Sequence, residues 1–167
     1  MLTDHDIGYI RNGFVRLDRL GDPALLRARR GRGELPQPAY VLPDGTEYVP
    51  RDYLPGFERA EFERRFLDAY RPWDAYLGGV YQLCLRRVTP ETIARKDELV
   101  AEIALELLAP RPRDPEWRAR LRVAVDELDA LERPFSPDHD RTAFGRPPTR
   151  DLLVARARER YLGDAAA

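Results

Sequence analysis

The chain has 167 residues, enough to bury a core as one compact domain. Its composition, 43% hydrophobic and 34% charged residues, is not that of a disordered chain, and no apolar run approaches the roughly 18 residues of a membrane span. The net charge of −1 removes the simplest case for a nucleic-acid binder. Because the N-terminus is polar and acidic, without the pattern of a signal peptide, we expect a cytoplasmic protein that does not bind membranes.

The pattern of residues 1–58 predicts several short helices and strands, and we call this N-terminal part the head. Thr3 can cap a helix that runs to about Asn12, and a second short helix is expected from about Val15 to Leu20. Asp22 followed by Pro23 is a strong helix start, and this helix should end near Arg30.

Within the head, Asp44-Gly45 lies between two apolar runs, which is the strongest short signal for a β-hairpin. We expect this hairpin at residues 39–49, followed by a short helix over residues 50–54. The order of short helices and hairpin resembles the winged helix of MerR and excisionase regulators. That resemblance implies a recognition helix at residues 23–32, whose candidate DNA contacts are Arg27, Arg29, Arg30 and Arg32.

Residues 59–167 predict long amphipathic helices that form a bundle. The expected helices cover residues 61–71, 72–88, 90–109, 115–131 and 149–162. The paired glycines Gly78-Gly79 are expected to allow close helix packing inside the second of them. A loop of some 16 residues follows Arg133, and loops of this length are usually functional or held by packing. The predicted fold class is mainly α, a helical bundle with a small winged-helix-like element that contains one β-hairpin, together one compact unit.

Both histidines lie in tripeptides of the same form, Asp4-His5-Asp6 and Asp138-His139-Asp140. A metal site shared between them is conceivable, but neither tripeptide has the i, i+3 or i, i+4 spacing of bundle metal sites, and capping is the preferred interpretation. We therefore predict no metal and no cofactor.

Cys84 lies on the apolar stripe of the expected helix 72–88, where a core thiol is the preferred interpretation over a nucleophile. Lys96 is the only lysine in a chain that otherwise uses arginine. Lysine can act as a base or hold an anion, whereas arginine cannot be deprotonated. Lys96, Tyr81 and Cys84 are thus the candidate catalytic residues, with a lysine exposed by chance as the alternative for Lys96.

Three segments, residues 35–50, 73–96 and 128–145, resemble a family of small bacterial proteins of unknown function that is labelled "natural product biosynthesis protein". The resemblance implies an accessory role in a biosynthetic pathway and selects residues for a pocket between the middle helices and the long loop. Together with aromatic residues that precede the glycine pair, the candidate ligand-binding residues are Trp73, Tyr76, Tyr81, Arg86, Thr92, Lys96, Asp140 and Arg141.

Three functions follow from these observations. The leading hypothesis is an accessory protein of a specialised-metabolite pathway that binds a small molecule or a biosynthetic partner protein. The alternative is a DNA-binding regulator that uses the helix 23–32 and the hairpin wing, although nucleic acid is the less favoured partner. The third is a small cofactor-independent enzyme of the pathway.

Overall fold

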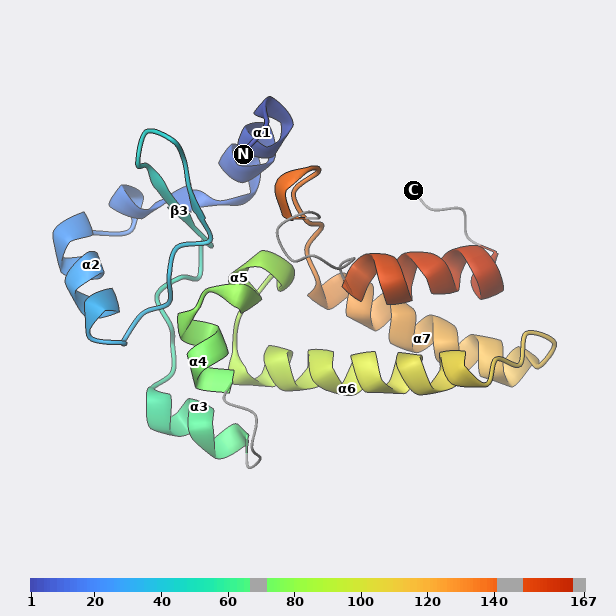
Figure 1. Cartoon of the computed structure of the whole chain (residues 1–167). Coiled ribbons are helices and arrows are strands. Elements are labelled where there is room, and N and C mark those ends of the chain that lie inside the picture. Colours follow the sequence, from blue (N-terminus) through green and yellow to red (C-terminus); the bar gives the residue numbers. More distant parts are fainter. Residues whose placement is uncertain (67–71, 141–148, 164–167) are drawn as a thin grey trace.

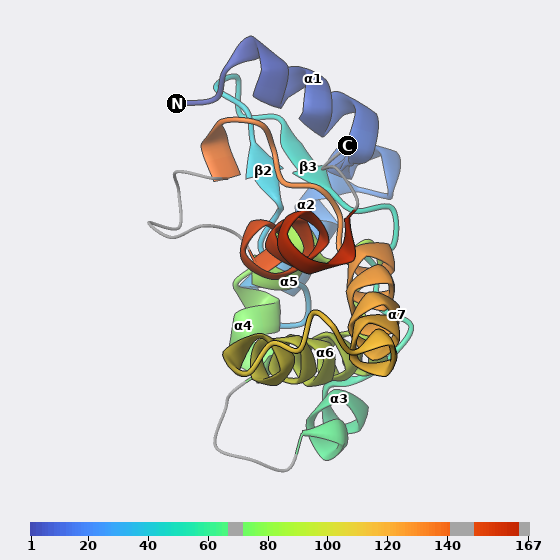
Figure 2. The ribbon, with the colours of Figure 1, turned by 90° about the vertical axis from the view of Figure 1, so that its right-hand side faces the viewer.

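The computed structural model describes residues 1–66, 72–140 and 149–163 and shows a mainly helical protein (Figure 1). A small three-stranded antiparallel sheet lies near the N-terminus, in the part that we call the head (residues 1–58). The predicted fold class, mainly helical with a small β-hairpin in the N-terminal part, is confirmed. The longest helices extend away from the head (Figure 1), and Figure 2 views them nearly end-on. No helix in these three ranges is both long and apolar enough to cross a membrane.

The head contains the first helix, the helix that starts at Pro23 and the hairpin that the sequence predicts. Thr3 caps the first helix through a capping box with Asp6, and the side chain of Asp22 accepts from the backbone N–H of Ala24 at the start of the second. The strands pair in the order β1-β3-β2, with Tyr40 opposite Tyr48 in the hairpin. The elements are α1 (Asp4–Gly13), β1 (Val15–Arg16), the 3-10 helix η1 (Leu17–Arg19), α2 (Pro23–Gly31), β2 (Tyr40–Val41) and β3 (Glu47–Val49).

Two predicted helices of the head are wrong. The segment from Val15 to Leu20 is strand β1 followed by η1, because Val15 pairs with Val49 at the edge of the hairpin. Its β-branched side chain suits that sheet position better than a helix. The segment 50–54 is only a turn, in which the Tyr53 hydroxyl donates to the carbonyl of Pro36 at 2.6 Å.

The helical part follows the predicted order, with its strongest starts at Thr89-Pro90 and Asp114-Pro115. The C-terminal helix is wound as two π-helical stretches and ends at Gly163, which has a φ of +72°. The elements are α3 (Arg59–Arg65), α4 (Pro72–Leu77), α5 (Val80–Cys84), α6 (Pro90–Leu108), α7 (Pro115–Leu131), η2 (Arg150–Ala155) and η3 (Arg158–Leu162).

The expected single helix over residues 72–88 is wrong, because it is broken at the glycine pair. Gly79 has a φ of +79°, so the backbone turns there and separates α4 from α5. A Cβ at Gly79 would lie 3.0 Å from the carbonyl oxygen of Gln37, whose own N–H donates to Leu77 at 2.7 Å. The glycine therefore allows the extended segment before the hairpin to lie against the helical part.

We expect Gly79→Ala to destabilise the protein by about 2 kcal/mol or more, because it adds left-handed strain and a close contact with Gln37. Urea unfolding of both proteins measures the difference. Gly45→Ala is the matched control, since Gly45 has a φ of +81° but open space around its Cβ position. Equal losses in the two variants would show that the contact with Gln37 costs nothing.

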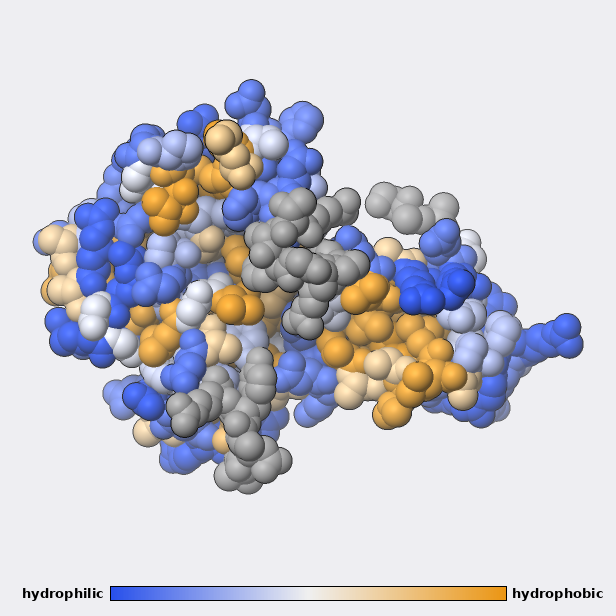
Figure 3. Space-filling model, in the orientation of Figure 1, coloured by the Kyte–Doolittle hydropathy of each residue, from blue (hydrophilic) through white to orange (hydrophobic). Residues whose placement is uncertain are grey.

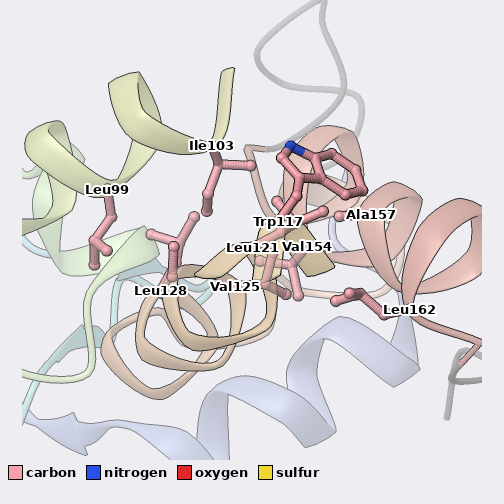
Figure 4. Packing of buried hydrophobic residues seen from close by; sticks show 10 residues of the cluster. Leu99, Ile103, Trp117, Leu121, Val125, Leu128, Val154, Ala157 and Leu162 are labelled. Atoms are coloured by element: carbon pink, nitrogen blue, oxygen red, sulfur yellow. The ribbon is translucent and has the colours of Figure 1, made fainter. Parts of the chain in front are cut away.

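The main core of the helical part lies between α6, α7 and the C-terminal helix. Trp117 points from α7 toward η2 and η3, as Figure 4 shows, and it is fully buried. Arg158 fixes the C-terminal helix on α7 through ion pairs of 2.9 Å with Asp126 and Asp129. The residues of this core are Leu99, Ile103, Trp117, Leu121, Ala124, Val125, Leu128, Val154, Ala157 and Leu162.

The head contacts the helical part through the two Asp-His-Asp tripeptides. The carboxylate of Asp6 accepts the backbone N–H groups of Asp138 and His139, each at 3.1 Å. The Tyr40 hydroxyl donates to the buried carboxylate of Asp140, and burial together with this bond raises the pKa of the phenol, so it keeps its proton. Capping, the preferred interpretation, thus accounts for Asp6, whose oxygens are engaged with the backbone.

Candidate anion-binding groove

An open groove of about 470 Å³ lies where α1, the turn after β3, the α5–α6 connection and the segment after α7 meet. Four of its side chains are guanidiniums, and one is a carboxylate. We call it the arginine groove and define it by Tyr9, Gly13, Arg51, Asp52, Arg86, Arg87, Arg133 and Pro134.

A short antiparallel bridge between Leu85 and Glu132 brings the ends of α5 and α7 together. On either side of it, the N–H of Arg86 donates to Leu131 and the N–H of Arg133 donates to Cys84, both at 2.9 Å. Two arginines that are 47 residues apart in the chain therefore line the same groove.

The opposite wall comes from the turn after the hairpin. Asp52 accepts the backbone N–H of Val88 at 3.1 Å, which ties this turn to the start of α6. Arg51, the preceding residue, is thereby held near Arg86 and Arg87 across a boundary between the head and the helical part.

The side chains of Arg133 and Tyr9 are held by contacts within the fold. The guanidinium of Arg133 stacks on the ring of Phe14, 4.4 Å from its centroid, and donates to the carbonyl of Leu85 at 3.0 Å. The Tyr9 hydroxyl donates to the carbonyl of Pro134. Burial raises the pKa of Tyr9 although the charge of Arg133 opposes this effect, so the phenol is neutral at physiological pH.

The charge of the groove is not balanced within the fold. Of the residues that the structure describes, none places a carboxylate within 4.0 Å of the guanidinium of Arg51, Arg86 or Arg87. Arginine presents planar pairs of N–H donors that match carboxylate and phosphate oxygens. The groove therefore offers unpaired anion-binding groups in a recess large enough for a small molecule.

A smaller hollow of about 290 Å³ adjoins the groove and shares Asp52 and Arg87 with it. It continues past Leu54 and Phe57 to the N-terminus of α6. Because Glu61 and Glu91 also line this hollow, it suits an uncharged organic group of a ligand held by the arginines rather than a second anionic group.

The arginines of the candidate recognition helix differ from those of the groove, because they form ion pairs with carboxylates. Arg27 and Arg30 both contact Glu47, at 2.8 Å and 2.7 Å, while Arg29 and Arg32 both contact Glu34. A hollow of about 230 Å³ beside Arg27 is likewise lined by an internal ion pair, Arg16 with Asp18. DNA binding through this helix stays a prediction, but its charges are already partnered inside the head.

Lys96 lies in a buried cluster with Glu132 and Cys84. Its Nζ is 3.1 Å from Oε1 of Glu132, and the two side chains are 13% and 0% exposed. Burial alone would lower the pKa of Lys96, but Cys84 and Glu132 raise it above its ordinary value. Burial raises the pKa of the Cys84 thiol. These shifts are opposite to those of a catalytic lysine and of a reactive cysteine, whose pKa values are lowered.

The other predicted ligand residues are mostly parts of the structure. Trp73, Tyr76 and Tyr81 are buried in an aromatic core with Phe62, and burial raises the pKa of the Tyr76 phenol. Thr92 completes the capping box of α6. Asp140 joins the head to the helical part, and Arg141 lies outside the described residues. Arg86 is the predicted ligand residue that the structure places in the arginine groove.

The sequence profile of DUF6058, a family of unknown function, matches residues 59–162. The chain belongs to this family. No curated protein and no solved structure matched the chain. Because the DUF6058 family has no assigned function, natural product biosynthesis stays a prediction, as does the winged-helix resemblance of the head.

The arginine groove is lined partly by residues of the DUF6058 match and partly by residues of the head. Arg86, Arg87 and Arg133 lie inside the matched residues, whereas Tyr9 and Arg51 lie before them. Among the arginines and the tyrosine of the groove, the sequence predicted Arg86 as a ligand residue and did not predict Tyr9, Arg51, Arg87 or Arg133. The adjacent pair Arg86-Arg87 is the one local signal, and two cations near the end of the expected helix 72–88 are equally what a helix dipole favours.

Proposed function

We propose that this protein binds an anionic small molecule in the arginine groove. The observation that carries the proposal is the presence of three guanidiniums, those of Arg51, Arg86 and Arg87, without a carboxylate partner among the described residues. Several unpaired cations held in one recess repel each other, and an anion removes that repulsion.

The recess suits a ligand that carries a carboxylate or phosphate and an organic part. The groove of about 470 Å³ is in the size range of small-molecule sites, and the adjoining hollow adds a path along Phe57. Arg133 and Tyr9 are held by contacts within the fold, so they offer a preorganised wall beside the exposed side chains of Arg51, Arg86 and Arg87.

This proposal fits an accessory, ligand-binding role in a biosynthetic pathway, the role that the family resemblance implies. The enzyme hypothesis has less support, because Lys96 and Cys84 are buried beside Glu132 and their pKa values are shifted away from catalytic use. The DNA hypothesis has less support, because the four arginines of residues 23–32 contact Glu34 or Glu47.

The test is a titration of the protein with pyrophosphate and with citrate. Binding is measured by isothermal titration calorimetry and by the NMR chemical shifts of the backbone amides. We expect binding that weakens with salt and shifts the amides of Arg51, Arg86 and Arg87. Arg86→Ala should weaken binding about 10-fold or more, since one charge-assisted contact contributes about 1.5–3 kcal/mol.

Arg118→Ala is the matched control, because Arg118 is an exposed arginine on α7 outside the groove. It should leave the affinity unchanged. Equal effects of Arg86→Ala and Arg118→Ala would mean that the anions bind to general surface charge, and the proposal would fail.

A further inference from the structure

The second half of α6 carries an apolar stripe on the side that faces away from the core. Leu105 and Leu108 are 68% and 80% exposed, and Ala101 and Ala104 are exposed beside them. These residues are three or four positions apart, so they lie along one face. Figure 3 shows hydrophobic residues gathered over this region of the helix.

A surface helix normally carries polar residues opposite its buried face. The buried face of α6 is already defined by Leu99 and Ile103, which are fully buried against α7 and the C-terminal helix. The second apolar face of the same helix therefore has no partner among the described residues of the chain. Exposed apolar stripes of this kind mark interaction surfaces.

The stripe is complementary to itself when two copies of α6 pair in opposite directions. With the two-fold axis between Ala104 and Leu105, Ala104 of one copy lies opposite Leu105 of the other. The same register sets Ala101 opposite Leu108. A small residue opposite a large one at each position lets two helices approach closely and fill the space between them.

The charges that flank the stripe fit the same register. Glu98 lies before the stripe, and Arg111, in the turn that follows α6, lies as many residues beyond the axis as Glu98 lies before it. Both side chains are largely exposed, 59% and 61%. An antiparallel pair brings Glu98 of each copy toward Arg111 of the other, whereas a parallel pair would place like charges together.

We propose that α6 is the interface of a symmetric homodimer, in which the stripe Ala101, Ala104, Leu105 and Leu108 packs antiparallel against its copy. Within each chain, Glu98 contacts Arg95 at 3.1 Å and Arg111 lies 4.0 Å from Glu106, so the contact between Glu98 and Arg111 extends two ion pairs that each chain already contains. The interface leaves the arginine groove free, since none of its residues lines that groove.

Sedimentation velocity across a wide concentration series tests the dimer. The wild-type chain is expected to be dimeric at high concentration, and Leu105→Glu should raise the dissociation constant at least about 30-fold, because each dimer receives two buried charges. Val123→Glu is the matched control on α7, where Val123 is 67% exposed outside the stripe, and it should leave the dimer intact. Circular dichroism verifies that each variant is folded.

A charge exchange tests the register. Glu98→Arg and Arg111→Glu should each weaken the dimer, and the double variant should restore most of the affinity. A wild-type chain that stays monomeric throughout, or variants of the stripe and of Val123 that behave alike, would overturn the proposed interface. Additive losses in the double exchange would overturn the antiparallel register.

Discussion

Lys96→Met is expected to destabilise the fold by about 3–5 kcal/mol, because it leaves the buried carboxylate of Glu132 without a counter-charge. Lys96 is the one cation within 4.0 Å of that carboxylate in the described part of the chain, and the Glu132 side chain is fully buried. At 3.1 Å the contact forms no hydrogen bond of good geometry, so its stabilisation is mainly charge balance.

The loss depends on pH in a defined direction. Burial raises the pKa of Glu132, and removing Lys96 takes away the charge that opposes this effect. A carboxyl group with a raised pKa in the folded state costs nothing below its unfolded pKa of about 4.3, and the cost grows as the pH rises above it. We therefore expect Lys96→Met to be close to wild type near pH 4 and clearly less stable at pH 7.

Guanidinium unfolding of Lys96→Met, Glu132→Met, the double variant and the control Arg95→Met measures these terms. The double variant Lys96→Met/Glu132→Met should recover most of the loss, since an apolar pair of similar volume often replaces a buried ion pair without cost. Arg95→Met is the control on the same helix, where the ion pair with Glu127 is 40% exposed on both sides and should contribute at most about 1 kcal/mol. Simple additivity of the two single losses would contradict a coupled pair.

The unique lysine illustrates what a sequence can and cannot predict. Its rarity in an arginine-rich chain selected Lys96 correctly as unusual, but the chemistry depends on Glu132 and Cys84, which are remote in the sequence. Burial decides the protonation of such a cluster, and burial is a property of the fold rather than of the local sequence. Thus the residue was predictable, whereas its role as a buried counter-charge was not.

The fold likewise has features with local causes, which the sequence predicts, and features with remote causes, which it does not. Helix starts at Asp22, Thr89 and Asp114 were predictable, because a capping residue and a following proline act within one turn. The break at Gly79 was missed, because its cause is the approach of Gln37, 42 residues earlier in the chain. Strand β1 was missed for the same reason, since Val15 becomes a strand only by pairing with Val49.

The arginine groove depends on still more distant contacts. Four segments of the chain supply its walls, and the bridge between Leu85 and Glu132 sets Arg86 beside Arg133. Periodicity indicates which residues of one helix share a face, but it carries no information about where the ends of two helices meet. For this reason the predicted pocket near Lys96 included Arg86 and missed its neighbours.

Asp6→Asn is expected to destabilise the protein by about 3 kcal/mol, because all the acceptor positions of Asp6 face donors. Oδ1 accepts from the N–H groups of Asp138 and His139, while Oδ2 accepts from the N–H and hydroxyl of Thr3 at 2.8 Å and 3.0 Å. An asparagine has only one acceptor oxygen, so its NH₂ group must point at one of these donor pairs.

The pH dependence provides an independent signature. Burial on its own would raise the pKa of Asp6, but the backbone N–H groups of Thr3, His139 and Asp138 lower it far below the ordinary value. A depressed carboxyl pKa contributes stability above the unfolded pKa of about 3.9, and this contribution is lost as the pH falls toward the folded pKa. The difference between wild type and Asp6→Asn should therefore be full at pH 7 and shrink progressively below about pH 4.

Asp4→Asn separates this capping role from a general effect of removing an acid from α1. Asp4 is exposed in the first turn and should contribute only about 0.3–1 kcal/mol through the helix dipole. Because Asp6 joins the head to the segment that carries Arg133, its loss should also weaken anion binding in the arginine groove. A variant that is destabilised equally at pH 3 and pH 7 would contradict the role of the Asp6 charge, and stability equal to that of Asp4→Asn would contradict its role as a cap for residues 138 and 139.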